Sequence, residues 1–201
     1  MTAIVRDNVD EKRRRLLLVA TSAAGAALAG GAAAPLLISW FPSARALAAG
    51  APIQADLSKL ELGQQITLEW RGKPVWVLHR TPEMVARLAQ NTPLLVDPES
   101  TASKQPDYVK GPQRSIKPEF FVVEGVCTHL GCSPTLKKEV GAASDMGGDW
   151  PGGYYCPCHN SRFDLAARVF KGSPAPSNMT VPPHRYASDF VVVVGEDAKG
   201  A

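Results

Sequence analysis

The sequence predicts an all-β head, an antiparallel β sandwich or small barrel, carried on one N-terminal transmembrane helix. Residues 16–44 contain no charged side chain, and these 29 positions exceed the roughly 20 apolar residues that span a bilayer core. Beyond them, short runs rich in Val, Ile, Thr and aromatic residues alternate with Gly- and Pro-containing turns, which is typical of all-β domains. All four cysteines lie between positions 127 and 158, so the chemistry of the head is expected there.

Length and composition exclude several classes of protein. A chain of 201 residues allows one domain with an appended segment. The 22 basic and 19 acidic side chains leave a net charge of only +3, and no basic stripe interleaves with aromatics, so we expect no nucleic-acid binding. With 45% hydrophobic and 20% charged residues, the chain is not disordered as a whole. Four cysteines are too few for a disulfide-dense mini-scaffold.

The N-terminal segment combines a targeting signal with an apolar run. Residues 1–15 are polar and end in Lys12 followed by three arginines. Adjacent arginines before a mildly apolar run are typical of a bacterial twin-arginine export signal. Because basic residues remain inside, we expect residues 1–15 in the cytoplasm and residues 16–42 as the membrane anchor. Pro35 is expected to kink or break the helix.

A cleaved signal is the alternative to a retained anchor. Two stretches of small residues, Ala44-Arg45-Ala46 and Ala46-Leu47-Ala48, resemble cleavage sites, and cleavage would leave a soluble exported head. We favour the anchor, because secretory apolar regions are only about 7–15 residues long. Residues 43–56 begin with small side chains and are expected to form a flexible hinge, which leaves residues 57–201 for the head.

The head is expected to consist mainly of short strands. Residues 65–70 and 74–79 are rich in Ile, Val, Thr and Trp, and the Arg71-Gly72-Lys73 between them predicts a hairpin. Residues 82–90 predict a short helix with Thr81 as its N-cap. The other expected elements are a long surface excursion over residues 91–118, a strand over 120–124, a glycine-rich loop over 141–153 and a closing strand over 186–194.

Two cysteine–histidine boxes carry the candidate chemistry. The boxes are Cys127-Thr128-His129-Leu130-Gly131-Cys132 and Cys156-Pro157-Cys158-His159-Asn160-Ser161. Two thiolates and two imidazoles can bind zinc tetrahedrally, or can hold a two-iron cluster with both histidines on one iron, and spacing alone does not separate these. Each box has one further cysteine, Cys132 or Cys158, and in an exported protein such a matched pair favours a disulfide between the two loops.

Both boxes resemble those of Rieske iron–sulfur proteins, in the form found in cytochrome bc complexes. The resemblance extends over nearly the whole chain, including the anchor, the Ser-Ile-Lys-Pro-Glu of residues 115–119 and the Gly-Ser-Pro-Ala-Pro of residues 172–176. It implies a Rieske head whose cluster-binding loop subdomain covers residues of about 125–178 and holds a 2Fe–2S cluster. By the resemblance, the iron ligands are Cys127 and Cys156 on one iron and His129 and His159 on the other, and Cys132 and Cys158 form the bridge.

The resemblance also implies a function. The chain would be the electron-transfer subunit of a bacterial ubiquinol–cytochrome c reductase, with cytochrome b and cytochrome c subunits as partners in a dimeric complex. It would sit in the inner membrane with its head in the periplasm. The exposed edge of His159, beside His129, would hydrogen-bond the quinol and couple proton to electron uptake. The head would then swing about residues 43–52 and deliver the electron to the cytochrome c subunit.

Three further residues are assigned roles on this basis. Leu130 is a large apolar residue in a loop expected to be exposed, so we expect it to contact the surface of the quinol site. Ser161 would donate a hydrogen bond to a bridging sulfide and so stabilise the reduced state. High-potential members have a Tyr two residues beyond this serine, where this chain has Phe163. We therefore predict a potential below that of Tyr-containing relatives but far above that of ferredoxins.

Three other classes of protein are alternatives to this interpretation. A Rieske subunit of another exported oxidoreductase, such as an arsenite-oxidase type, could share the signal and the boxes, but the excursion 91–118 and its lead-in favour the bc type. The ferredoxin-like component of a ring-hydroxylating oxygenase would normally lack Cys132, Cys158 and the apolar segment 16–41. A zinc-binding structural module would lack the brown colour of an iron–sulfur protein.

Overall fold

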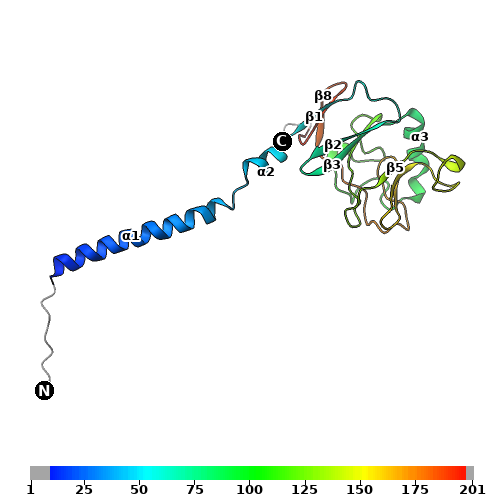
Figure 1. Ribbon diagram of the computed structural model, residues 1–201. Coiled ribbons are helices and arrows are strands. Elements are labelled where there is room, and N and C mark those ends of the chain that lie inside the picture. Colours follow the sequence, from blue (N-terminus) through cyan, green and yellow to red (C-terminus); the bar gives the residue numbers. More distant parts are fainter. Residues whose placement is uncertain (1–9, 198–201) are drawn as a thin grey trace, which may run out of the picture. The chain divides into compact units, whose positions relative to one another are not determined.

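The computed structural model describes residues 10–197, which divide into two compact units at the Leu47–Ala48 junction. The first is almost entirely the long helix α1, and the second is a strand-rich head (Figure 1). The residues of each unit account for its own secondary structure.

Helix α1 (Glu11–Ile38) is long and apolar enough to cross a membrane. Asp10 caps it, because its carboxylate accepts from the backbone N–H groups of Lys12 and Arg13. At 1.5 Å per residue its 28 residues extend about 42 Å, more than the roughly 30 Å of a hydrocarbon core. The expected break at Pro35 is wrong, because the helix continues to Ile38 and the Ser39 N–H donates to the Pro35 carbonyl at 3.0 Å. The proline costs one internal hydrogen bond, and only three helical residues follow it.

The expected hinge over residues 43–56 needs correction. Residues Ala44–Ala49 form a short helix, α2, and the Ser43 side chain accepts from the Ala46 N–H at its start. Strand β1 (Ile53–Asp56) pairs antiparallel with β9 (Val191–Val194), so these four residues belong to the head. Ile53 and Ala55 pack against the core, and this alternation of apolar and polar residues makes the segment a strand.

Within residues 48–197, the head contains three sheets of three strands each. The central one has the order β2 (Gln65–Trp70), β3 (Lys73–His79), β4 (Phe120–Glu124), and the expected hairpin is its first pair. A second has the order β1-β9-β8, with β8 at His184–Ser188. The third consists of β5 (Thr135–Lys137), β6 (Gly153–Cys156) and β7 (Ser161–Phe163). The expected single closing strand over 186–194 is wrong, because a turn after Ser188 divides it into β8 and β9.

The helical parts of the head are short. Helix α3 (Pro82–Gln90) begins where expected, and the Thr81 hydroxyl accepts from the Met84 N–H as its N-cap. Three single 3₁₀ turns lie at Thr92–Leu94, Asp107–Val109 and Gly141–Ala143. The excursion over residues 91–118 contains the first two of these turns, and it is less superficial than expected, because Leu95, Val109 and Arg114 are buried.

The central sheet is buried on both faces. Val75, Val77, Phe120 and Val122 point into a core shared with β9. The alternating residues Trp76, Leu78, Phe121 and Val123 point into a second core shared with α3 and with β6 and β7. Strand β4 is consequently buried at every residue. The second core also contains Cys127 and Cys156, so packing in this core fixes the position of one cysteine from each box.

Candidate metal centre

The first box follows directly from the buried strand β4. Gly125 connects them, and a Cβ atom there would overlap the ring of Trp76, so only glycine allows the chain to pass this close. The box closes on itself, because the Cys127 N–H donates to the Cys132 carbonyl at 2.8 Å and the Gly131 N–H donates to the Cys127 carbonyl at 3.0 Å. This tight turn fixes where Cys127 and Cys132 lie.

The second box spans the β6–β7 turn. Cys156 ends β6 and Ser161 begins β7, and the two are register partners. Cys158 and His159 therefore lie in the turn, where both are exposed. A disulfide between Cys132 and Cys158 joins the two boxes across 26 residues, with Cα atoms 6.6 Å apart. The expected bridge is confirmed.

The four expected ligands form two close pairs, one of thiols and one of imidazoles. Cys127 and Cys156 are free thiols and both are buried. The rings of His129 and His159 are perpendicular, with centroids 4.7 Å apart. The Nδ1 atom of His129 is buried and has no hydrogen-bond partner among the described residues. Two soft thiols and a buried imidazole nitrogen lacking a protein partner fit a group that binds both sulfur and nitrogen.

The environment of the thiols bears on which sulfurs can be ligands. Burial, together with the neighbouring Cys156 thiol, raises the pKa of Cys127, so a thiolate at this position needs a bound cation. The sulfurs of Cys132, Cys156 and Cys158 lie within 4.8 Å of one another. That trio is not itself a ligand set, because two of its sulfurs form the disulfide. The short distances between these sulfurs show instead that the disulfide lies next to the Cys156 thiol.

Ser161 and the segment after the boxes enclose the site. The buried Ser161 hydroxyl accepts from the Ala175 N–H at 3.1 Å. The Thr128 hydroxyl donates to the Ser177 carbonyl at 2.7 Å. Residues 175–177 are therefore tied to both boxes. Leu130, in contrast, is not enclosed by this segment, because 71% of its surface is exposed in the loop beside His129.

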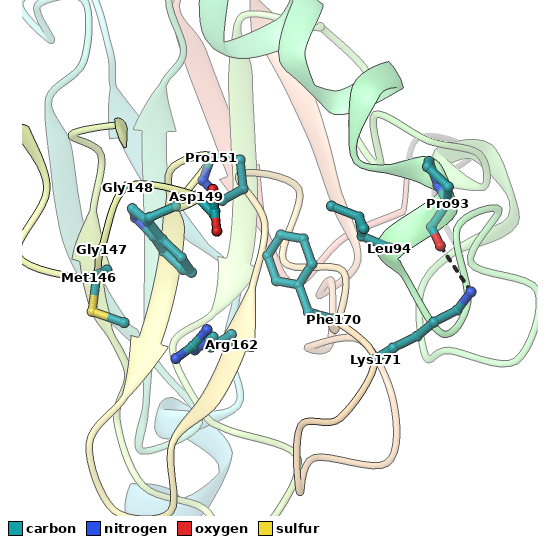
Figure 2. A pocket seen from close by; sticks show the side chains of 11 residues that line it. Pro93, Leu94, Met146, Gly147, Gly148, Asp149, Pro151, Arg162, Phe170 and Lys171 are labelled. Carbon is teal, nitrogen blue, oxygen red and sulfur yellow. Dashed lines mark hydrogen bonds between the residues drawn. The ribbon is translucent and has the colours of Figure 1, made fainter. Parts of the chain in front are cut away.

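A cavity of about 400 Å³ lies apart from these ligands (Figure 2). The glycine-rich loop with Met146 and Trp150 forms one wall, and Leu94 and Phe170 form another. The Trp150 indole donates to the Lys137 carbonyl, and the Lys171 ammonium donates to the Pro93 carbonyl, which hold the two walls in place. No expected site residue lines this cavity, although Arg162 directly follows Ser161.

A set of fully buried charged side chains was not predicted from the sequence. Its members are Arg80, Arg114, Asp164 and Arg168. One signal was available: Asp164 and Arg168 are four residues apart in a stretch without helical periodicity, directly after the second box. Nothing local in the sequence distinguishes Arg80 or Arg114 from a solvated arginine.

Comparison with known proteins decides the family. Residues 55–184 match the family described as Rieske [2Fe-2S] domain, and residues 5–43 match "Ubiquitinol-cytochrome C reductase Fe-S subunit TAT signal". A protein of Allochromatium vinosum, named "Ubiquinol-cytochrome c reductase iron-sulfur subunit", is 59% identical over 167 residues, which are 83% of this chain and 80% of that protein. The chain belongs to the Rieske iron–sulfur family.

A further relative of this Rieske chain carries the same name. A Bradyrhizobium diazoefficiens protein named "Ubiquinol-cytochrome c reductase iron-sulfur subunit" is 40% identical over 162 residues, covering 80% of this chain and 81% of that protein. A chain of the solved structure "Hyperthermophilic respiratory Complex III" is 23% identical, with a TM-score of 0.46, over 87% of this chain and 97% of that chain. The Rieske family match means that the cofactor is a 2Fe–2S cluster, and the thiol and imidazole donors described above fit it.

Proposed function

We propose that this Rieske chain is the electron-transfer subunit of a bacterial ubiquinol–cytochrome c reductase. It takes one electron from quinol and passes it to the cytochrome c subunit of the complex. The observation that carries the proposal is the joining of two cysteine–histidine boxes by a disulfide, on a chain 59% identical to a protein of that name. The bound 2Fe–2S cluster supplies a one-electron acceptor, whose potential is raised because neutral imidazoles replace two thiolates.

Burial and the pairing of the boxes support the ligand assignment that the family resemblance implies. Cys127 and Cys156 would hold one iron inside the core, where water is excluded, and His129 and His159 would hold the other. His159 is exposed, so the ring nitrogen that does not face the cysteines can meet a substrate. A quinol hydroxyl would donate its hydrogen bond to that nitrogen and then transfer its proton there as the electron leaves.

Leu130 would make the apolar part of the same contact. Its side chain lies in the loop beside His129, and burying an exposed leucine contributes about 1.5–3 kcal/mol. It would be covered only when the tip of the head docks at the quinol site. Together, the histidine edge and Leu130 would form a docking surface with one polar and one apolar part.

The remaining parts of the chain would place this surface correctly. Helix α1 would anchor the protein in the inner membrane, with residues 1–15 in the cytoplasm and the head in the periplasm. Cytochrome b and cytochrome c subunits would be the partners, in a dimeric complex. Residues 43–52 would act as the hinge for movement between them, with α2 as a short helical piece inside it.

The experiment is purification of the full chain from membranes, followed by an assay of quinol-dependent cytochrome c reduction. We expect the chain to purify with cytochromes b and c, and we expect His159→Ala to abolish activity while the cytochromes remain present. If the chain instead purifies without these cytochromes and supports arsenite oxidation, the proposal is overturned in favour of another exported oxidoreductase.

A further inference from the structure

Three guanidinium groups and one carboxylate are buried side by side in the head. Arg80, Arg114, Arg168 and Asp164 are each at most 1% exposed. Asp164 pairs with Arg168 at 2.7 Å. Among residues 10–197, neither Arg80 nor Arg114 has a carboxylate within ion-pair distance. The only other buried carboxylate among these residues, Glu124, pairs with Lys73, so the buried set carries a net charge of +2.

Neutral groups hold the two unpaired arginines. Arg114 donates to the carbonyls of Ala166, Ala167 and Met179 and to the Gln105 side chain. Arg80 donates to the carbonyls of Gln113, Pro118 and Leu165 and to the Ser115 hydroxyl. Burial lowers the pKa of both guanidinium groups to about 10, so both remain cationic near neutral pH. Neutral groups solvate both charges, although the Arg114 Nε has no partner among the described residues. Asp164, and for Arg114 also Asp97, attracts these charges only from beyond ion-pair distance.

Arg114 is hydrogen-bonded to Met179 and Arg80 to Leu165, and both of these residues pack in the same core as Cys127 and Cys156. Ala175 and Ser177 hydrogen-bond to the two boxes. Two residues further along the same segment, the Met179 carbonyl accepts a hydrogen bond from Arg114. The other carbonyls that Arg114 binds belong to residues 166 and 167, just beyond β7. Ala166, Ala167 and Met179 also pack in the same apolar core as Cys127 and Cys156. Charges act over longer range through such a core than through water.

The arrangement is costly for a purely structural role. Burying a charge without a counter-charge costs several kcal/mol even when its hydrogen bonds are satisfied. Neutral donors could bind the same carbonyls without that cost. Reduction adds one negative charge to the site, and a net positive interior stabilises the reduced state.

We propose that Arg80 and Arg114 raise the midpoint potential of the iron–sulfur site through their unneutralised buried charge, while Asp164 opposes them. The inference rests on the proposed function, because it requires the cluster to be present. The arginines are tuning residues, since they touch neither quinol nor the ligand atoms. Their charge would offset part of the potential that we expect to be lost because Phe163 stands where high-potential members have tyrosine.

The test is a redox titration of the full complex in membranes, monitored by electron paramagnetic resonance (EPR). We expect Arg114→Gln to lower the ratio of reduced to oxidised sites at a fixed ambient potential by roughly threefold to tenfold. Tenfold corresponds to about 59 mV for a one-electron couple. Asp164→Asn should raise the potential, because it removes the one negative member while its amide oxygen can still accept from the Ala166 and Arg168 N–H groups.

Three further variants separate charge from packing. Arg114→Lys keeps the charge, so its potential should remain close to that of the parent. Arg80→Gln removes the other unpaired charge and should lower the potential as Arg114→Gln does. Lys104→Gln removes an exposed charge, on a residue whose carbonyl accepts from the Val181 N–H close to the same segment, and should cause no shift because solvent screens it.

Shifts of opposite sign in the arginine and aspartate variants, with unchanged EPR line shape, would support the inference. Equal potentials in all variants, or shifts of the same sign, would overturn it. If Arg114→Gln does not accumulate, Arg80→Gln and Asp164→Asn provide the same comparison. A parent chain without any Rieske EPR signal would instead refute the proposed function, so the two failures are distinguishable.

Discussion

At the residue scale, the two kinds of donor differ in exposure. Cys127 and Cys156 are buried in the core, whereas His159 lies at the surface and Leu130 extends beside His129. Buried thiolates are protected from solvent, and a surface imidazole can meet a substrate. Under the proposed function, the buried cysteine of each box would hold the cofactor, and the exposed His159 and Leu130 would contact the quinol.

Phe163 gives the first prediction at this scale. It is fully buried, and as residues two apart on β7 its side chain and that of Ser161 share one face of the strand. We expect Phe163→Tyr to raise the midpoint potential, because the added hydroxyl can donate to a cysteine sulfur. A neutral hydrogen bond contributes about 0.5–1.5 kcal/mol, which is roughly a twofold to tenfold change in the reduced-to-oxidised ratio. A redox titration checks this, with Phe163→Leu as control. A midpoint potential of Phe163→Tyr no higher than that of the parent would contradict the prediction.

Leu130 gives the second. We expect Leu130→Gly to slow quinol oxidation by about tenfold or more, because it removes roughly 1.5–3 kcal/mol of apolar contact. The EPR signal of the cluster should be unchanged, since 71% of this side chain faces solvent. Steady-state turnover with varied quinol concentration measures the effect. Leu62→Gly, at a leucine that is 60% exposed away from the boxes, should turn over normally, and normal turnover of Leu130→Gly would refute the docking role.

At the scale of elements, the β5-β6-β7 sheet and the disulfide hold the two boxes together. Strand β6 brings Cys156 into the core, and β7 returns with Ser161 beside it. The disulfide then fixes the turn of the second box to the end of the first. Two predictions test these supports separately.

Gly153 opens strand β6, and a Cβ atom there would collide with the backbone carbonyl of Phe163 on β7. We expect Gly153→Ala to destabilise the head by several kcal/mol and to reduce cluster content, because the two strands must separate. Gly148→Ala is the matched control, since a Cβ atom in that position of the same loop meets nothing within 4 Å. Chemical denaturation and iron analysis measure both variants. A Gly153→Ala protein as stable as the control would contradict this account of the strand pair.

Removal of the disulfide should separate the boxes. For the 26-residue separation between its cysteines, a bridge contributes about 3 kcal/mol of stability. We expect the double variant Cys132→Ser/Cys158→Ser to lose about that much and to lose iron more rapidly on warming. Thermal unfolding and the decay of the EPR signal measure this. Retention of iron at the parent's rate would show that the loops hold together without the bridge.

Several elements could be predicted because their signals are local. The hairpin around Arg71-Gly72-Lys73, helix α3 after Thr81 and the disulfide between the boxes are all confirmed. Strand β1 was not predicted because its partner, β9, lies about 140 residues later in the sequence, and an alternation over only four residues is too short to indicate a strand. The single strand expected over 186–194 failed for a related reason, since only tertiary pairing shows that the chain reverses there.

At the scale of the whole molecule, burial of charge is what the sequence could not reveal. Arg80, Arg114 and Arg168 look like surface residues in the sequence, because the carbonyls that satisfy them come from distant segments. The membrane helix and the export signal, in contrast, follow from composition and were predicted, although the helix extends through Pro35. The motifs in the sequence thus predict the ligands, whereas only the fold shows that Arg80, Arg114 and Arg168 are buried.

The central claim is that the two boxes hold a high-potential Rieske cluster on a membrane-anchored chain. The most direct measurement is low-temperature EPR of the purified full chain after reduction by ascorbate alone. We predict a rhombic Rieske signal under this mild reductant, which would establish a high-potential, histidine-ligated cluster. No signal with either ascorbate or dithionite, together with zinc in elemental analysis, would contradict the account and leave a structural metal module.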